Sequence, residues 1–520
     1  MALDTLCMAT LLSLLLIAIL FLLNNIKQVK KQNNRLPPGP PKLPILGNLH
    51  QLGKLPHQSF WKLSQKYGPV MLLKLGRVSL VVISSAEAAK DVLKIHDLDC
   101  CSRPPLTGSG KLSYSFLDVA FAPYGDYWRE MRKMCVLELF SLKRVQSFRF
   151  IREEEVASLM DSISQSSSTA SPVELSEKMY ALTGSIVFRM AFGKRFQGSN
   201  FDDNDYRFQE LIRAAMAVAG GFTAEECFPY VGWLIDRVRG YHSMIERVCH
   251  ELDDFYQQII NDHLKPEGGR TKQEPEDIID VMLKIERDHQ IQSGRQAQLT
   301  RDGIKAVTMN ILLGGVDTSA STVVWAMAEL ARNPKAMKKA QDEVRNCVGN
   351  KGRVTEADID KLEYLKLIIK ETLRLHPPAP LLLPRETISH FTVNGYSIYP
   401  KTLMQVNAWA IGRDPNTWRK PEEFFPERFF DSSFDFKGQN FAYLPFGAGR
   451  RSCPGIHLGL ITSELALANL LYCFDWKLPN GMKEEDLNME EAPGQSVTVS
   501  KKTPLNLMPT NYLQLKVGND

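Results

Sequence analysis

The sequence lacks the short spacings that usually mark a metal or nucleotide site. Its nine cysteines are odd in number, widely spread and contain no CxxC pair, which excludes the common zinc sites and a disulfide framework. None of the ten histidines stands in an HExxH motif, and no Gly-x-Gly-x-x-Gly follows a predicted strand. We therefore expect no histidine-held metal, no nicotinamide or flavin of the chain's own, and a reduced, cytosolic main body.

An excess of charge of either sign is also missing. The 63 Lys and Arg against 59 Asp and Glu leave a net charge of +4, which argues against a nucleic-acid partner bound by bulk charge. Hydrophobic residues make up 44% and charged residues 23%, which excludes disordered and collagen-like classes. A chain of this length has room for about three domains. The helical patterns nevertheless favour one large, mostly helical domain.

Side-chain charge is absent from residues 6–23, where Leu, Ile and Phe dominate over a length that can span a bilayer as a helix. Basic residues follow this run and only Asp4 precedes it, so a cleaved signal peptide or a buried core helix is the weaker alternative. The positive-inside rule places the chain after the run in the cytosol. We predict a single-pass protein of the endoplasmic reticulum membrane, with a lumenal end (1–5), a transmembrane signal anchor (6–23), a basic and proline-rich hinge (24–44) and a cytosolic domain (45–520).

Capping residues and periodicity predict several elements of this domain. The Pro-Pro-Gly-Pro-Pro segment at 37–41 is expected to be a stiff spacer, because proline fixes φ. Thr300 is a candidate N-cap for a long helix that Asn333-Pro334 ends. Further expected elements are a hairpin of 70–75 and 80–84, a helix over 358–376, short strands within 382–406 around Asn394-Gly395, a helix from just after Cys453 to about 471, and an exposed loop over 265–276.

The strongest chemical signal is the segment Phe446-Gly447-Ala448-Gly449-Arg450-Arg451-Ser452-Cys453-Pro454-Gly455. Its glycines let the backbone turn tightly and approach a flat ligand. A helix that begins just after Cys453 would direct free N–H groups and its positive end at the sulfur, which favours the thiolate, a ligand for iron. Arg451 could hydrogen-bond a carboxylate of the same ligand. A buried free cysteine is the alternative that Cys453 alone would suggest.

A second signal lies inside the long predicted helix, at Gly314-Gly315-Val316-Asp317-Thr318-Ser319. Glycine lowers helix stability, and Asp and Thr seek hydrogen bonds, so these residues are costly in an apolar helix. A helix that passes over a ligand explains them, because glycine makes room, Thr318 opens the hydrogen-bond ladder and Asp317 relays protons. A mild kink with a polar surface stripe is the alternative.

Two residue pairs at helical spacing are weaker signals. Glu371 and Arg374 lie three residues apart, which normally produces only a surface ion pair. Trp128 and Arg132 lie four residues apart on one helix face, where an arginine often does no more than cover an aromatic ring.

Together these segments resemble the cytochrome P-450 family. The cysteine segment has the family's Phe-x-x-Gly-x-Arg-x-Cys-x-Gly at every fixed position, and residues 314–319 match its oxygen-activating stretch. Glu371-x-x-Arg374, Pro426-Glu427-Arg428-Phe429 and Trp128-x-x-x-Arg132 match further motifs, in the family's order. Pro-Pro-Gly-Pro after the anchor and Pro-Phe-Gly-x-Gly-Arg-Arg at the cysteine are similar to the plant microsomal branch. Ser452 departs from the aliphatic residue that is frequent there.

The resemblance implies a mainly α fold with small β-sheets, in which a long central helix lies over a haem and the cysteine loop lies on the proximal side. It implies haem b (iron protoporphyrin IX) with Cys453 as the axial ligand of the iron, and Thr318 and Asp317 as catalytic proton relays. A structural network of Glu371, Arg374 and Arg428 would support the cysteine loop. The cofactor-binding positions that the resemblance adds are Arg451, Trp128, Arg132, Arg385, Phe446, Gly447, Gly449 and Gly315.

The implied activity is that of a monooxygenase, which inserts one oxygen atom of O2 into a small apolar substrate by hydroxylation or epoxidation. Electrons would come from NADPH through NADPH–cytochrome P-450 reductase, with cytochrome b5 as a further donor. A terpenoid or an indole alkaloid is the expected substrate class. The alternatives are a non-oxygenating isomerase or dehydratase, against which the Asp317-Thr318 pair counts, and a non-catalytic haem carrier.

Two surfaces follow from the same resemblance. A basic patch near the cysteine would attract an acidic reductase, and a largely apolar pocket would hold the substrate. The patch is expected from Arg129, Lys133, Lys143, Arg144 and Arg450, and the pocket from Leu106–Phe121, Arg213–Phe222, Met309–Leu313, Pro380–Leu383 and Ser496–Thr498.

Overall fold

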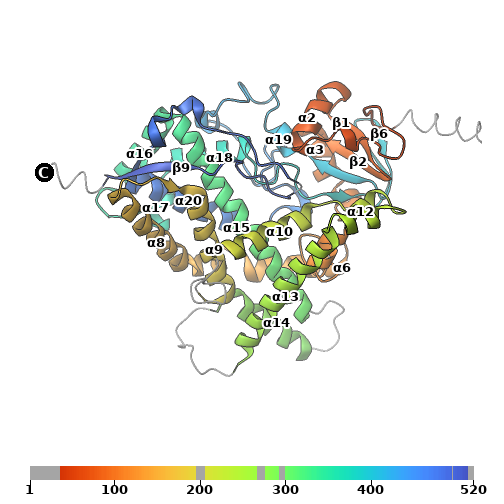
Figure 1. The fold of residues 1–520 in the computed structure, drawn as a ribbon, viewed down its shortest axis with the longest axis horizontal. Helices are drawn as coiled ribbons and strands as arrows, with labels where there is room; N and C mark the ends of the chain where they lie inside the picture. Colours follow the sequence, from red (N-terminus) through yellow and green to blue (C-terminus); the bar gives the residue numbers. More distant parts are fainter. Residues whose placement is uncertain (1–35, 195–204, 266–275, 292–298, 495, 513–520) are drawn as a thin grey trace, which may run out of the picture.

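A single long helix organises the fold. The computed structural model describes residues 36–194, 205–265, 276–291, 299–494 and 496–512. Helix α15 (Arg301–Arg332) crosses the middle of the molecule (Figure 1). It begins where the side chain of Thr300 accepts a hydrogen bond from the backbone N–H of Gly303, at 3.1 Å, and its C-cap is Asn333. The predicted boundaries of this helix are therefore confirmed.

The other helices surround α15 and fill most of the molecule. Helices α9 and α20 pack directly against it, and the three form much of the main hydrophobic core. The helices are α2 (Pro56–Tyr67), α3 (Ala86–Lys90), α4 (Asp97–Cys100), α5 (Thr107–Leu112), α6 (Asp126–Met134), α7 (Leu142–Ser147), α8 (Arg149–Ser168), α9 (Leu175–Phe192), α10 (Asp205–Gly220), α11 (Ala224–Cys227), α12 (Gly232–Val238), α13 (Tyr241–Leu264), α14 (Ile278–Ile291), α16 (Pro334–Val348), α17 (Glu356–Ile359), α18 (Glu363–Leu375), α19 (Ala408–Ile411) and α20 (Ile456–Cys473).

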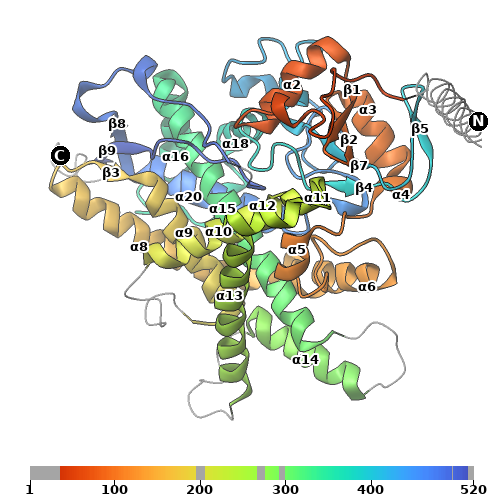
Figure 2. The ribbon, with the colours of Figure 1, turned by 45° about the vertical axis from the view of Figure 1, so that its right-hand side comes forward.

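Short strands form small sheets at the two ends of the molecule, with α15 between them (Figure 2). One sheet has the order β1 (Val70–Leu75), β2 (Val78–Ile83), β7 (Leu403–Val406), β4 (Arg385–Glu386); only the β2–β7 pairing is parallel. The other has the order β3 (Val173–Glu174), β9 (Asn506–Asn511), β8 (Phe474–Lys477). A separate hairpin pairs β5 (Phe391–Val393) with β6 (Tyr396–Ile398).

The two predicted hairpin turns are confirmed. Strands β1 and β2 pair antiparallel on either side of Gly76-Arg77. Asn394 and Gly395 join β5 to β6 with φ angles of 49° and 79°, the left-handed values that a tight two-residue turn requires.

The predicted helix over 358–376 is divided into α17 and α18, which the sequence pattern did not show. Thr355 and Asp358 form a capping box that starts α17. A separate start for α18 is provided by Glu343, whose carboxylate accepts hydrogen bonds from the backbone N–H groups of Tyr364 and Leu365, at 2.7 and 3.0 Å. Because this cap comes from another helix, local sequence could not reveal it.

The proline segment is docked on the folded domain instead of forming a free spacer. The backbone N–H of Leu72 in β1 donates to the carbonyl of Pro38, at 2.8 Å, and the Asn48 amide donates to the carbonyl of Pro40, at 3.2 Å. A Cβ at Gly39 would lie 2.0 Å from the Leu72 carbonyl oxygen, so only glycine fits there. The described part of the expected hinge therefore belongs to the globular body.

Two described helices, Arg301–Arg332 and Ile456–Cys473, are long and apolar enough to cross a membrane. Their most apolar windows are 83% and 72% buried inside the protein, so they are core helices. The predicted anchor at 6–23 lies outside the described residues, as does most of the predicted loop over 265–276.

Candidate active site

A cavity lies between α15, the start of α20 and the cysteine segment. Its volume is about 330 Å³, within the range of about 300–1,000 Å³ that is typical of ligand pockets. Helices α15 and α20 run side by side next to it (Figures 1 and 2). The cavity is lined by Cys453 and its neighbours, by Gly314, Gly315 and Thr318 of α15, and by four arginines.

Two glycines with left-handed backbone shape the cysteine loop. Gly447 and Gly449 have φ angles of 67° and 70°, and a Cβ at Gly449 would lie 2.5 Å from the carbonyl oxygen of Leu93. The backbone N–H of Cys453 donates to the carbonyl of Phe446, at 3.0 Å, and closes the loop. Glycine is required here both by conformation and by close approach.

The thiol of Cys453 faces the cavity. Its side chain is accessible, although protein surrounds it closely enough that burial raises the pKa of the thiol. The accessible area is thus open to the cavity and not to bulk water. The backbone N–H of Gly455 and the charge of Arg132 act in the opposite direction and lower this pKa. A bound metal ion would complete the deprotonation, because thiolates and not thiols coordinate metals.

Four arginines bring positive charge to the cavity wall. They are Arg103, Arg132, Arg385 and Arg451, and no Asp or Glu is found among the described lining residues. Burial lowers the pKa of Arg451 to about 10, and that of Arg103 well below its usual value, with further lowering by neighbouring arginines. Two of the four cations are buried and two are half-buried. Such a cluster, without an acid among the described lining residues, fits a ligand that carries negative charge, such as carboxylates.

Backbone carbonyls hold two of these arginines rigidly. Arg451 donates to the carbonyls of Cys101 (2.8 Å), Val119 (3.3 Å) and Ala122 (2.6 Å). Arg103, which the sequence analysis did not identify, donates to the carbonyls of Ala120, Leu383 and Pro384 at 2.9, 2.8 and 2.7 Å. Neutral carbonyls orient the guanidinium groups without cancelling their charge.

The other two arginines bind the loop itself. Arg385 donates to Asp97 at 2.8 Å and to the carbonyl of Ala448 at 3.1 Å. Arg132 donates to the carbonyl of Ser452 at 2.6 Å. These contacts connect β4 and helix α6 to the segment that carries the cysteine.

Trp128, which the resemblance placed among the cofactor-binding positions, lies behind the cavity wall and does not line the cavity. Its indole N–H donates to the carbonyl of Val119 at 3.0 Å, and the guanidinium carbon of Arg451 lies 4.1 Å from its ring centroid. Trp128 and Arg132 share α6, but only Arg132 lines the cavity. Stacking on Trp128 positions Arg451, so the tryptophan acts on the wall through its neighbour.

The two adjacent glycines of α15 differ in their surroundings. A Cβ at Gly314 would meet nothing within 4 Å, whereas a Cβ at Gly315 would lie 2.8 Å from Cγ2 of Val187 in α9. Gly314 therefore leaves the cavity open, and Gly315 allows α9 and α15 to approach. The hydroxyl of Thr318 lines the cavity and donates to the carbonyl of Gly314 at 2.6 Å.

Asp317 points away from the cavity, although its neighbour Thr318 lines it. Its carboxylate is buried and accepts hydrogen bonds from Tyr180 of α9, at 2.5 Å, and from Thr498. Thr498 itself lines the cavity. Sequence spacing did not identify Tyr180, and Thr498 was expected only as part of the pocket.

The structure brings Glu371, Arg374 and Arg428 together in a buried network. Arg374 donates twice to the Glu371 carboxylate, at 2.8 and 2.9 Å, and Arg428 donates once, at 2.9 Å. The backbone N–H of Phe425 donates to the same carboxylate at 2.8 Å. Arg374 also donates to the carbonyls of Gly412 and Pro421. The network thereby fastens the chain that leads to the cysteine loop onto α18.

Every range expected for the pocket contributes to the cavity wall. The remaining lining is mostly apolar, with Ile186, Val187 and Met190 of α9 as unexpected members. The contributions from the expected ranges are Val119, Ala120 and Phe121; Met216 and Ala219; Asn310, Ile311 and Leu313; Leu382 and Leu383; and Val497 and Thr498.

The five residues of the expected basic patch lie on α6, α7 and the cysteine loop. Arg129, Lys133, Lys143 and Arg450 are exposed, and Arg144 is half-buried. Arg129 pairs with Asp126, and Arg450 pairs with Asp97 at 2.9 Å. The contact between Arg132 and Ser452 places α6 beside the cysteine loop.

Comparisons with known proteins match nearly the whole chain to one family. The family model described as Cytochrome P450 matches residues 37–507. The chain is 53% identical to Cytochrome P450 71B37 of Arabidopsis thaliana over 486 residues, which covers 94% of this chain and 95% of that protein. It is 53% identical to Cytochrome P450 71B26 of the same plant over 502 residues, with 96% and 98% covered. The matched length includes every lining residue of the cavity.

Proposed function

The chain belongs to the cytochrome P-450 family and is a plant monooxygenase, and we propose that it hydroxylates or epoxidises a small apolar specialised metabolite. One observation carries the proposal: the thiol of Cys453 lines the same cavity as Gly314 and Thr318. A single cofactor bound in this cavity could therefore be ligated by the Cys453 thiolate on one side and face Gly314 and Thr318 of α15 on the other.

The cavity fits haem b by the chemistry of its wall. Cys453 would ligate the iron, and Arg132, Arg385 and Arg451 would bind the two carboxylates, with Arg103 adding positive charge. Trp128 would support Arg451 by stacking. Haem supplies the activation of O2 and the oxidation of the substrate when it is bound. The remaining positions proposed to contact it are Phe446, Gly447, Gly449 and Gly315.

The protein's own part in the reaction is orientation and proton supply. The hydroxyl of Thr318 now donates to the Gly314 carbonyl and would turn toward the cavity to donate a proton there. Asp317 would resupply that proton as a general acid. If Thr318→Ala left the yield of product per NADPH unchanged, this role would be wrong.

We propose that electrons from NADPH arrive through NADPH–cytochrome P-450 reductase, with cytochrome b5 as a second donor. The basic patch supports this, because its exposed cations lie on elements joined to the cysteine loop. An acidic surface of the reductase would be attracted to it at low ionic strength.

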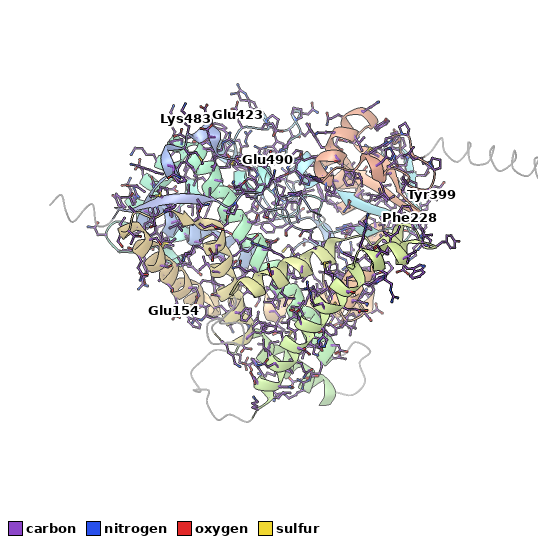
Figure 3. The ribbon with its side chains drawn as sticks, viewed as in Figure 1. Glu154, Phe228, Tyr399, Glu423, Lys483 and Glu490 are labelled. Carbon is purple, nitrogen blue, oxygen red and sulfur yellow. The ribbon has the colours of Figure 1, made fainter. Side chains whose placement is uncertain are left out.

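We further propose that residues 6–23 anchor the chain in the endoplasmic reticulum membrane, with residues 1–5 on the lumenal side. The folded body lies in the cytosol, with the described part of the hinge (24–44) docked on it. An exposed apolar surface, in which Ile45 is 83% and Tyr230 91% accessible, supports this arrangement. The β1–β2 turn joins its two halves: Gly76 N–H donates to the Leu46 carbonyl and Arg77 N–H to the Cys227 carbonyl. Phe228, labelled in Figure 3, lies two residues before the second half. The surface comprises Leu43, Ile45, Leu46, Tyr230, Val231, Trp233, Leu234 and Val238.

The apolar lining supports a terpenoid or an indole alkaloid as the substrate. Among the described lining residues outside the four arginines, the polar side chains are small hydroxyls, Asn310 and, besides Cys453, one further thiol. A charged metabolite would lose its hydration without gaining an opposite charge in this part of the cavity.

Two measurements test the proposal. The reduced, carbon-monoxide-bound protein should show the red-shifted Soret band of thiolate ligation, and Cys453→Ser should lose it. A histidine-type spectrum in the unmodified protein would overturn the assignment. The second measurement follows NADPH oxidation with purified reductase and a panel of terpenoids and indole alkaloids, with products identified by mass. It distinguishes a monooxygenase from an isomerase or dehydratase and from a haem carrier. Product that forms without NADPH would indicate an isomerase or dehydratase, and a thiolate spectrum without any product would indicate a carrier.

A further inference from the structure

The Asp317 carboxylate stands in the middle of a buried chain of hydroxyl groups. Tyr180 donates to its Oδ1 atom at 2.5 Å, and Thr498 donates to its Oδ2 atom. The three residues are each no more than 8% exposed. They come from α9, α15 and the segment before β9, so the contact exists only in the folded protein.

The chain of hydroxyls extends in both directions from Asp317. Ser500, which is half-buried, lies near enough to the hydroxyl of Tyr180 to lower the pKa of the tyrosine. At the other end, Thr498 lines the cavity. Thr498 thus lies at the cavity end of the pair formed by Tyr180 and Asp317, and the half-buried Ser500 lies at the other end.

We propose that Ser500, Tyr180, Asp317 and Thr498 form the route by which a proton reaches the cavity, which rests on the monooxygenase function proposed above. Asp317 does not line the cavity, so a proton from it needs an intermediate group. Thr498 is that group among the described residues, because it touches both the carboxylate and the cavity.

Each step of the route conserves the number of bonds to hydrogen. Tyr180 gives its proton to Oδ1 of Asp317 while it receives one from Ser500, which is restored by water. Protonated Asp317 then turns its carboxyl group so that the new O–H bond faces Thr498. It donates this proton to the Thr498 oxygen, while the Thr498 hydroxyl rotates and gives its own proton to a water molecule in the cavity. Burial and the Asp317 charge raise the pKa of Tyr180, so its proton leaves only as another arrives.

An exposed cation lies beside the route. The guanidinium of Arg213, in α10, lies 5.1 Å from the centroid of the Tyr180 ring. It lowers the pKa of Tyr180 and partly offsets the effect of burial. Arg213 thus moderates the energy of moving a proton away from the tyrosine.

The experiment removes single hydroxyls from the full-length protein with bound haem and reductase. We expect Tyr180→Phe and Thr498→Val to lower product formed per NADPH by about tenfold or more, since general acid catalysis contributes about 10²–10⁴-fold. Thr498→Ser should recover most of the loss in Thr498→Val, because it restores the hydroxyl. The control is Tyr256→Phe, which removes a buried hydroxyl that has no partner among the described residues.

A second measurement does not depend on turnover. Infrared difference spectra of aspartate-labelled protein, with Asp317→Asn as the reference, should show the Asp317 carboxylate band shifted in Tyr180→Phe and in Thr498→Val. An unshifted band, or unchanged product per NADPH in both variants, would overturn the route. If Asp317→Asn and Thr318→Ala lower the yield while these two variants do not, the route alone is wrong. If all four leave the yield unchanged, the proton-relay role in the proposed function fails as well.

Discussion

Removing the charge of Glu371 should destabilise the protein measurably. Its carboxylate accepts four hydrogen bonds, two from Arg374, one from Arg428 and one from the backbone N–H of Phe425. The side chains of Glu371 and Arg374 are 0% exposed, and that of Arg428 is 8% exposed. Glu371→Gln keeps the shape but leaves two guanidinium groups without a buried counter-charge.

The size of the effect follows from general magnitudes. Breaking a buried ion pair from one side costs about 3–5 kcal/mol. An unfolding entropy of about 2.1 cal/mol/K per residue amounts to about 1.1 kcal/mol/K for this chain, so the midpoint of thermal unfolding should fall by about 3–5 °C. The haem-bound fraction should fall in parallel, because the network fastens the chain leading to the cysteine loop.

The assay is thermal unfolding followed by circular dichroism, with the carbon-monoxide difference spectrum as a measure of bound haem. Glu423→Gln is a matched control: Glu423, labelled in Figure 3, also forms an ion pair at three-residue spacing, with Lys420 at 3.0 Å, but both side chains are exposed. Its loss should change stability by less than about 0.5 kcal/mol. Equal midpoints for the two variants would refute the buried-network argument.

Three further predictions concern single features. Gly314→Ala should raise the free energy of unfolding by up to about 1 kcal/mol, whereas Gly315→Ala should lower it by about 1–3 kcal/mol through overpacking against α9; thermal unfolding checks both. Burial raises the pKa of Asp118 to about 6, so its stabilising effect is complete below the unfolded value and lost as the pH rises through 6. The stability of the unmodified protein relative to Asp118→Asn should therefore fall by about 1.4 kcal/mol between pH 5 and 7.5. Lys133→Glu with Lys143→Glu should raise the KM for reductase by about threefold to tenfold at low salt, and the effect should vanish at high salt.

Features set by local sequence were predictable. The cap at Thr300, the stop at Asn333-Pro334 and the turn at Asn394-Gly395 depend on residues within a few positions of one another, and the structure has all three. The cysteine loop is of the same kind, because left-handed glycines fix its path. Features that arise where distant segments meet were not predictable. Glu343 caps α18 from another helix, and nothing in its sequence neighbourhood indicates this.

The residues of the candidate site also fall into those that a local motif reveals and those that distant segments bring together. Cys453, Arg451 and Thr318 could be found because each stands in a dense motif. Arg103 carries no comparable signal, and its role on the cavity wall depends on carbonyls from residues 120, 383 and 384. Trp128 and Arg132 do share a face of α6, but spacing could not show that Arg451 would lie against the tryptophan ring.

Asp317 and Thr318 are adjacent in α15, and this explains why a residue from another segment is needed to connect Asp317 with the cavity. Successive residues of an α-helix are rotated by about 100°, so an acid and an alcohol next to each other point in different directions. In this protein the alcohol faces the cavity, and the acid turns toward α9 and the segment before β9. The sequence motif therefore specifies only half of a proton relay. The other half must come from a side chain that contacts both the acid and the cavity. In this fold that side chain is Thr498.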